Sequence, residues 1–101
     1  MFGTIARLKP KAGEEGALRE LQDRWWRERK PKVKGAITGY LCKPVDGPAD
    51  EQILIAIFDS KESYMANASD PEQDAWYREM RSHLQSDPVW TDVEIEEAPK
   101  G

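Results

Sequence analysis

Residues 53–58 read Ile-Leu-Ile-Ala-Ile-Phe and are apolar at every position. Their β-branched content predicts a strand, in which successive side chains point to opposite faces of a sheet. The isoleucines at positions 53, 55 and 57 therefore share one face, and the residues between them share the other. Because leaving each isoleucine in water would forgo about 1.5 to 3 kcal/mol, the sheet that contains this strand needs cover on both sides.

The spacing of apolar residues elsewhere predicts the remaining elements. Alternation predicts three further strands, over residues 2–9, 35–42 and 89–96. Helical spacing predicts a helix from Gly13 to the stop at Pro31, a short helix capped by Asp59 or Ser60 that runs to about Ala68, and a third helix after Asp70. Asp70 followed by Pro71 is the strongest start signal, because aspartate suits the N-cap and proline the first helical position.

The predicted order is β-α-β-β-α-β with the second helix broken in two, which is the split βαβ or ferredoxin-like arrangement of the α+β class. We expect a four-stranded antiparallel sheet with helices on one face only. A second identical chain is the simplest cover for the other face, since most soluble oligomers are symmetric homo-oligomers. The sequence thus predicts a homodimer; an exposed patch or a different partner is the alternative.

A length of 101 residues predicts one domain, over residues 1–97, with a loose C-terminal tail at 98–101. The single cysteine, Cys42, excludes an intrachain disulfide. No Cys/His spacing is typical of a metal site, so we expect no bound metal. The N-terminus lacks a basic region followed by a long apolar stretch, so we expect no signal peptide, no membrane association and a cytoplasmic location.

Positive charge is concentrated between Arg24 and Lys34, where two tryptophans also lie, and acidic residues gather between Asp92 and Glu97. A basic run beside aromatic residues can indicate nucleic-acid binding. The net charge of −4 argues against that, and cations near the C-terminal end of a helix are favoured by the helix dipole. We therefore expect a solvated basic face and no nucleic-acid partner; an anionic ligand or an acidic self-contact is the alternative.

Trp25 and Trp26 are neighbours on the first predicted helix, so their indoles point about 100° apart. Both rings cannot face the centre of one core. One of them must lie at a rim, a pocket or an interface.

Three stretches and the order of elements carry a resemblance to a known family. They are the helix opening Lys-Ala-Gly-Glu-Glu-Gly-Ala-Leu at 11–18, the strand Gly-Ala-Ile-Thr-Gly-Tyr-Leu at 35–41, and the junction Phe-Asp-Ser-Lys-Glu-Ser-Tyr at 58–64. Together they resemble the antibiotic biosynthesis monooxygenase superfamily, over nearly the whole chain. The resemblance implies a dimeric α/β barrel.

The same resemblance implies an oxygenase that needs no cofactor and acts on a small aromatic or quinol-type substrate in a cleft between sheet and helices. The superfamily also contains haem-degrading enzymes, but the Asn, Trp and His of that branch do not match Ala6, Asn67 and Trp76. The alternative is a non-enzymatic dimeric module that binds a small apolar molecule or regulates a partner.

The oxygenase branch lines its cleft with Asn, Trp and Tyr, and Asn67, Trp76 and Tyr77 resemble that set. Each has a plainer explanation: Asn67 can cap the broken helix, and Trp76 can fill the core. Tyr40 and Tyr64 each carry a phenol that could bond a substrate oxygen or pack at the dimer surface.

His83 is the only imidazole, and histidine ordinarily titrates closest to neutrality, so it is the candidate catalytic base. A lone histidine near a helix end can equally be an ordinary half-buried or capping residue. Arg7 lies in a strand suited to burial, so it either faces the ligand cleft or pairs with an acid. Of the two, we expect the salt bridge, with the acidic last strand as its partner.

Overall fold

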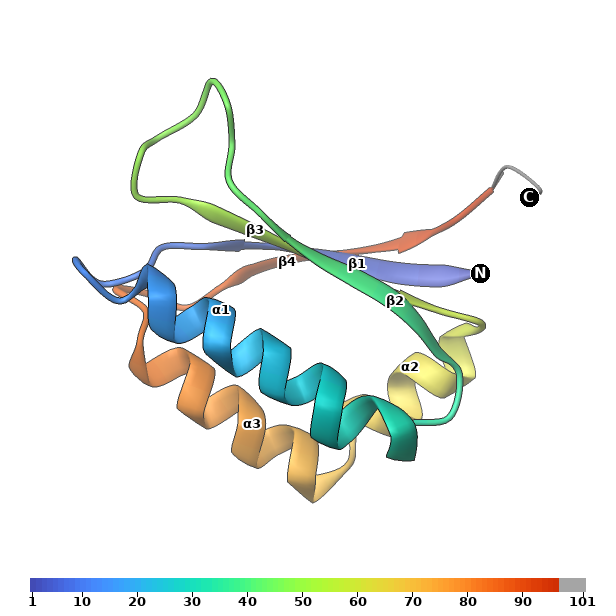
Figure 1. Ribbon diagram of the computed structural model, residues 1–101. Helices are drawn as coiled ribbons and strands as arrows, with labels where there is room; N and C mark the ends of the chain where they lie inside the picture. Colours follow the sequence, from blue (N-terminus) through green and yellow to red (C-terminus); the bar gives the residue numbers. More distant parts are fainter. Residues whose placement is uncertain (97–101) are drawn as a thin grey trace.

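The computed structural model describes residues 1–96, which form one four-stranded antiparallel sheet with its helices on one face (Figure 1). The strands are β1 (Phe2–Leu8), β2 (Ala36–Cys42), β3 (Gln52–Phe58) and β4 (Val89–Glu94), in the order β2-β3-β1-β4. The helices are α1 (Glu15–Arg24), α2 (Lys61–Ala68) and α3 (Pro71–Ser82). The predicted α+β ferredoxin-like fold, with a second helix broken in two, is confirmed.

Local signals set the helix boundaries. The Ser60 hydroxyl accepts a hydrogen bond from the Ser63 amide at 3.1 Å, so Ser60 and not Asp59 caps α2. The Asp70 carboxylate accepts one from the Glu72 amide at 2.8 Å and caps α3, as predicted. Such caps satisfy amides that the first helical turn leaves without partners.

The first predicted helix is not regular throughout. After α1 the chain continues into a π-helical segment, η1 (Trp25–Arg29), and a short 3₁₀ turn, η2 (Lys30–Lys32). The Lys30 amide donates to the Trp25 carbonyl, five residues back, which is the π-helical pattern. The last strand is also shorter than predicted and ends at Glu94; the predicted loose tail at 98–101 lies outside the described residues.

Leucines dominate the core between sheet and helices. Its buried members are Ala6, Leu8, Leu18, Leu21, Leu54, Met80 and Leu84. Leu54 and Phe58 of β3 face this core and are buried, while the three isoleucines of the same strand lie on the other face and are half-buried. Because neighbouring strands already shield part of each isoleucine, the cost of leaving that face uncovered is smaller than full exposure would give.

The strand register defines the open face, the side of the sheet away from the helices. Tyr40, Ile55 and Ile5 lie opposite one another across β2, β3 and β1. The apolar side chains of this face are Ile5, Tyr40, Ile53, Ile55, Ile57, Val89 and Val93. Tyr40 is 55% exposed and Val89 is 62% exposed. None of the helices between residues 1 and 96 has the length and apolarity that a bilayer crossing needs.

We expect Gly39→Ala to lower the free energy of unfolding by about 1 to 3 kcal/mol, because adding a methyl group to a tightly packed site forces its neighbours to shift. A Cβ at Gly39 would lie 2.8 Å from the carbonyl oxygen of Ile55 and 3.1 Å from Cζ2 of Trp26. Urea unfolding followed by circular dichroism measures the change.

Gly16→Ala in α1 is the matched control. The nearest atom to its added Cβ, an Arg19 guanidinium nitrogen, is 3.5 Å away. Alanine is favoured over glycine inside helices by about 1 kcal/mol, so this variant should be at least as stable as the wild type. Equal stabilities for Gly39→Ala and the wild type would contradict the close approach of Trp26 to β2.

Candidate functional site

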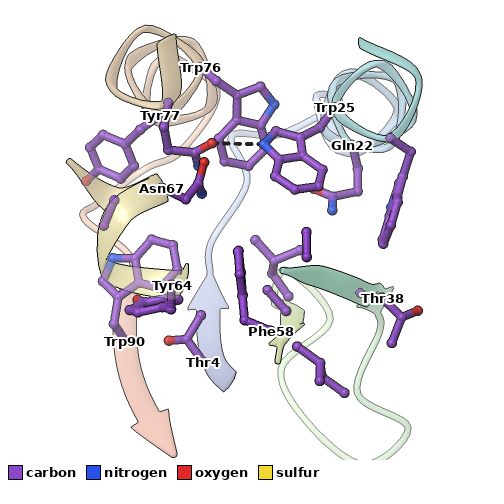
Figure 2. Close-up of a pocket in the computed structure, with 18 of the residues that line it drawn as sticks. Thr4, Gln22, Trp25, Thr38, Phe58, Tyr64, Asn67, Trp76, Tyr77 and Trp90 are labelled. Carbon is purple, nitrogen blue, oxygen red and sulfur yellow. Dashed lines mark hydrogen bonds between the residues drawn. The ribbon is translucent and has the colours of Figure 1, made fainter. Parts of the chain in front are cut away.

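A cavity of about 420 Å³ lies between the sheet and the helices (Figure 2). This volume is within the range of small-molecule sites. The aromatic residues that line it are Trp25, Trp26, Phe58, Tyr64, Trp76, Tyr77 and Trp90. The lining is therefore suited to a flat apolar molecule.

The floor of the cavity is a row of small residues that crosses the whole sheet. Gly39, Ala56, Thr4 and Asp92 lie opposite one another on β2, β3, β1 and β4, and all four line the cavity. The next row of residues that face the helices lies on the side of the leucine core and contains Leu41, Leu54 and Ala6. The cavity thus lies over the row where the side chains that face the helices are small, between the leucines on one side and Phe58 and Phe2 on the other.

Two tryptophans of η1 form one wall. Trp25 is buried and donates its indole N–H to Oε1 of Gln73 at 2.9 Å. Trp26 is half-buried and lies against the bare backbone of Gly39. Both indoles line the cavity, and their rings meet edge to face, with centroids 5.7 Å apart. One of the two was predicted to lie at a rim, a pocket or an interface, and Trp26 lies at the pocket; Trp25 is buried and also lines it.

A second wall, next to the first, comes from α3. The Trp76 indole N–H donates to the Leu21 carbonyl at 3.4 Å, and its ring centroid lies 6.4 Å from that of Trp25 in an edge arrangement. Tyr77 lies 6.4 Å from Trp90 of β4. These contacts hold both side chains of α3 in position over the floor.

A polar group occupies the β4 end of the floor. Oδ1 of Asp92 accepts hydrogen bonds from the Thr4 hydroxyl at 2.8 Å and from the Tyr64 hydroxyl at 3.1 Å. Burial, helped by the nearby Asp92 carboxylate, raises the pKa of Tyr64 above its ordinary value, while the Thr4 hydrogen bond acts in the opposite direction. Tyr64 therefore stays a neutral phenol at neutral pH and donates its proton to the hydrogen bond with Asp92.

Asn67 lies at the end of α2, where Arg29 holds it. The Arg29 guanidinium donates to Oδ1 of Asn67 at 2.9 Å and to Oε2 of Glu72 at 2.7 Å, and the arginine side chain is only 11% exposed. Arg29 therefore ties the end of η1 to the junction between α2 and α3.

Four of the predicted site residues come together around the cavity: Tyr64, Asn67, Trp76 and Tyr77. His83 lies apart from the cavity, at the C-cap of α3, with Nδ1 3.0 Å from Oε1 of Glu14. Tyr40 lies on the open face of the sheet. A ligand held in this cavity would contact neither of them.

Arg7 also lies outside the cavity, on the open face. Its Nη1 is 3.4 Å from Oε1 of Glu51, in the loop before β3. The expected partner in the acidic last strand is therefore wrong, because Asp92 and Glu94 point to the helix side of the sheet and Arg7 to the other.

Sequence reasoning missed Trp90 and Asp92 as site residues. Both lie on the edge strand β4 and on the face toward the helices, where Trp90 is opposite Ala6 and Asp92 is opposite Thr4. The alternation of this strand was visible in the sequence. The sequence did not show which of the two faces of the strand the helices cover. In the part of the chain described, residues 1–96, no three His, Cys, Asp or Glu side chains come together as a metal site.

Comparisons with known proteins identify the fold. No protein-family model matches the chain, and no curated protein matches it. Among solved structures, Rv0793 from Mycobacterium tuberculosis has a TM-score of 0.79 and 18% identity, over 98% of this chain and 98% of that one. A Caulobacter crescentus protein provisionally named an antibiotic biosynthesis monooxygenase has a TM-score of 0.81 and 14% identity, over 95% and 90%.

SnoaB, a cofactor-independent oxygenase from Streptomyces nogalater, has a TM-score of 0.76 and 11% identity, over 96% of this chain and 94% of that one. Further matches carry the name antibiotic biosynthesis monooxygenase, again provisionally, in Nitrosomonas europaea and Deinococcus radiodurans. At these identities the likeness concerns the fold. The chain has the fold of the antibiotic biosynthesis monooxygenases, as the resemblance in its sequence predicted.

Proposed function

We propose that the protein is a cofactor-independent, monooxygenase-like enzyme that acts on a small aromatic or quinol-type molecule bound in the aromatic cavity. The observation that carries the proposal is the cavity itself, a space of about 420 Å³ whose lining includes four tryptophans and two tyrosines. The likeness of fold to SnoaB supports the choice of reaction.

The cavity offers the groups that such a reaction needs. Trp76 and Tyr77 would pack against the flat faces of the ligand, and Asn67 would bond one of its oxygens. Without a cofactor, dioxygen has to react with an electron-rich substrate, so the site needs a proton acceptor beside the bound substrate. Asp92 would accept the hydrogen bond of a ligand hydroxyl and, during oxidation, its proton.

A non-enzymatic binding module is the second candidate. The observation that favours it is that, within residues 1–96, neither an imidazole nor a thiol lines the cavity. Binding would then use the same aromatic walls, and the protein would act through a ligand-dependent contact. The cysteine count also fits a protein that works in a reducing compartment such as the cytoplasm.

We also propose that two chains pair through the open face to form the α/β barrel. Tyr40 and Val89 are the most exposed large apolar residues there, at 55% and 62%, and the half-buried isoleucines of β1 and β3 lie beside them. Contiguous apolar patches of this kind mark interaction sites, and a second copy offers a surface of the same chemistry.

With hydroquinone and 1,5-dihydroxynaphthalene as substrates and no cofactor added, we expect the wild type to consume dioxygen, as an oxygen electrode measures. His83→Ala should keep this activity, because His83 lies outside the cavity. A shift of tryptophan fluorescence with either compound and no oxygen uptake would favour the binding module. Loss of uptake in His83→Ala would return the role of base to the histidine.

We expect Ala56→Leu to weaken ligand binding by about ten-fold or more, because the larger side chain fills the floor of the cavity. Ala75→Leu is the matched control, since Ala75 is exposed on α3 and does not line the cavity. Calorimetric titration with 1,5-dihydroxynaphthalene measures the affinities of both variants. Equal affinities of Ala56→Leu and the wild type would place the ligand elsewhere.

We expect Tyr40→Glu to convert a wild-type dimer into a folded monomer, because the charge would be buried at the pairing face without a partner. Met65→Glu is the control: Met65 is 50% exposed but lies on α2, on the helix side. Sedimentation velocity at micromolar concentration distinguishes the two states. A wild type that sediments as a monomer would contradict the barrel.

A further inference from the structure

The charges in the lining of the cavity are all of one sign. Asp74 and Asp92 contribute carboxylates, and Gln22, Asn67 and Gln73 contribute neutral amides. Along residues 1–96, no lysine, arginine or histidine lines the cavity. An anionic ligand would therefore find no cation to offset the loss of its hydration.

The two carboxylates differ in their partners. Asp74 is paired with Arg78, whose Nε lies 3.0 Å from it on the outer side of α3. Asp92 accepts hydrogen bonds only from neutral hydroxyls, those of Thr4 and Tyr64, and no described side chain forms an ion pair with it. Thus no described cation lies within ion-pair distance of the Asp92 carboxylate, which is exposed at the β4 end of the floor.

Two cations near the cavity already have partners. Arg29 bonds Asn67 of the lining, and Glu72 and Asp70 neutralise its charge, at 2.7 and 3.8 Å. Lys30 lies over the Trp26 ring at 5.8 Å, and Trp26 packs on Gly39 of β2. Since three strand spacings of about 4.8 Å separate β2 from β4, this cation is on the order of 14 Å across the sheet from Asp92.

Aromatic rings surround the acidic end. Tyr64 contacts Asp92 directly, and Trp90, two residues before it on the same face of β4, lies 6.4 Å from Tyr77. Figure 2 shows these three rings on the left of the cavity, across from Trp25 and Gln22. Faces of aromatic rings attract cations, and an unpaired carboxylate beside them strengthens that attraction.

We infer that the ligand of this cavity carries a protonated amine as well as a flat aromatic body. The ammonium group binds Asp92 among Tyr64, Tyr77 and Trp90, and the aromatic body extends over Ala56 toward Trp25 and Trp26. This inference rests on the proposed function insofar as both concern the same cavity, and it adds the charge of the ligand.

The test uses three probes with the same phenyl body and different charge: 2-phenylethylamine, 2-phenylethanol and 3-phenylpropionate. Calorimetric titration should give the amine an affinity at least about ten-fold above that of the carboxylate, with the alcohol between them. Asp92→Asn keeps an acceptor for the Thr4 and Tyr64 hydroxyls and removes the charge. This variant should lower the affinity for the amine by about ten-fold and change the affinity for the alcohol by less than about two-fold.

Glu94→Gln is the control, because Glu94 lies on the same strand and the same face but does not line the cavity. It should leave all three affinities unchanged. If the carboxylate binds as tightly as the amine, or Asp92→Asn binds the amine as the wild type does, the inference is overturned while the aromatic cavity stands. If none of the three probes and neither hydroxylated aromatic binds, both the inference and the proposed function are wrong.

Discussion

The sizes of the side chains that face the helices determine where this protein can bind anything. On one side of the cavity the sheet carries leucines, which pack against α1 and α3 into a solid core. In the next row Gly39, Ala56, Thr4 and Asp92 leave a gap, with Phe58 beyond it, and the tryptophans of η1 and α3 cover this gap without filling it. Burial of the leucines stabilises the fold, so the gap can persist without collapsing the layers.

Much of the fold could be predicted because its signals are local. The period of apolar residues distinguishes strands from helices, and Asp70 followed by Pro71 marks a helix start without any knowledge of the tertiary structure. The two apolar faces of β3 likewise follow from the chain alone. What the sequence does not contain is the shielding that neighbouring strands already give to the three isoleucines, which are half-buried in a single chain.

The site was harder to predict because its floor joins one residue from each of four strands. Gly39 and Asp92 are far apart in sequence, and only the register brings them into one row. His83 looked functional by residue type, yet its carbonyl accepts the Lys11 amide at 2.9 Å and its ring meets Glu14, so it fastens the end of α3 to the segment before α1. Trp76, Tyr77, Asn67 and Tyr64 do line the cavity. The first three were singled out by their likeness to the residue types of the oxygenase branch, and Tyr64 by its phenol.

The π-helical segment η1 carries Trp25 and Trp26, which line the cavity, and Arg29, which bonds Glu72 and Asn67. Because its i→i+5 hydrogen bond spans one residue more than the i→i+4 bond of an α-helix, the segment takes up an extra residue within a single widened turn. A chain one residue shorter there would wind as an ordinary α-helix, and the side chains that follow would keep their direction. The irregular turn therefore adds a residue beside the cavity without disturbing the alignment of α1 with the α2–α3 junction.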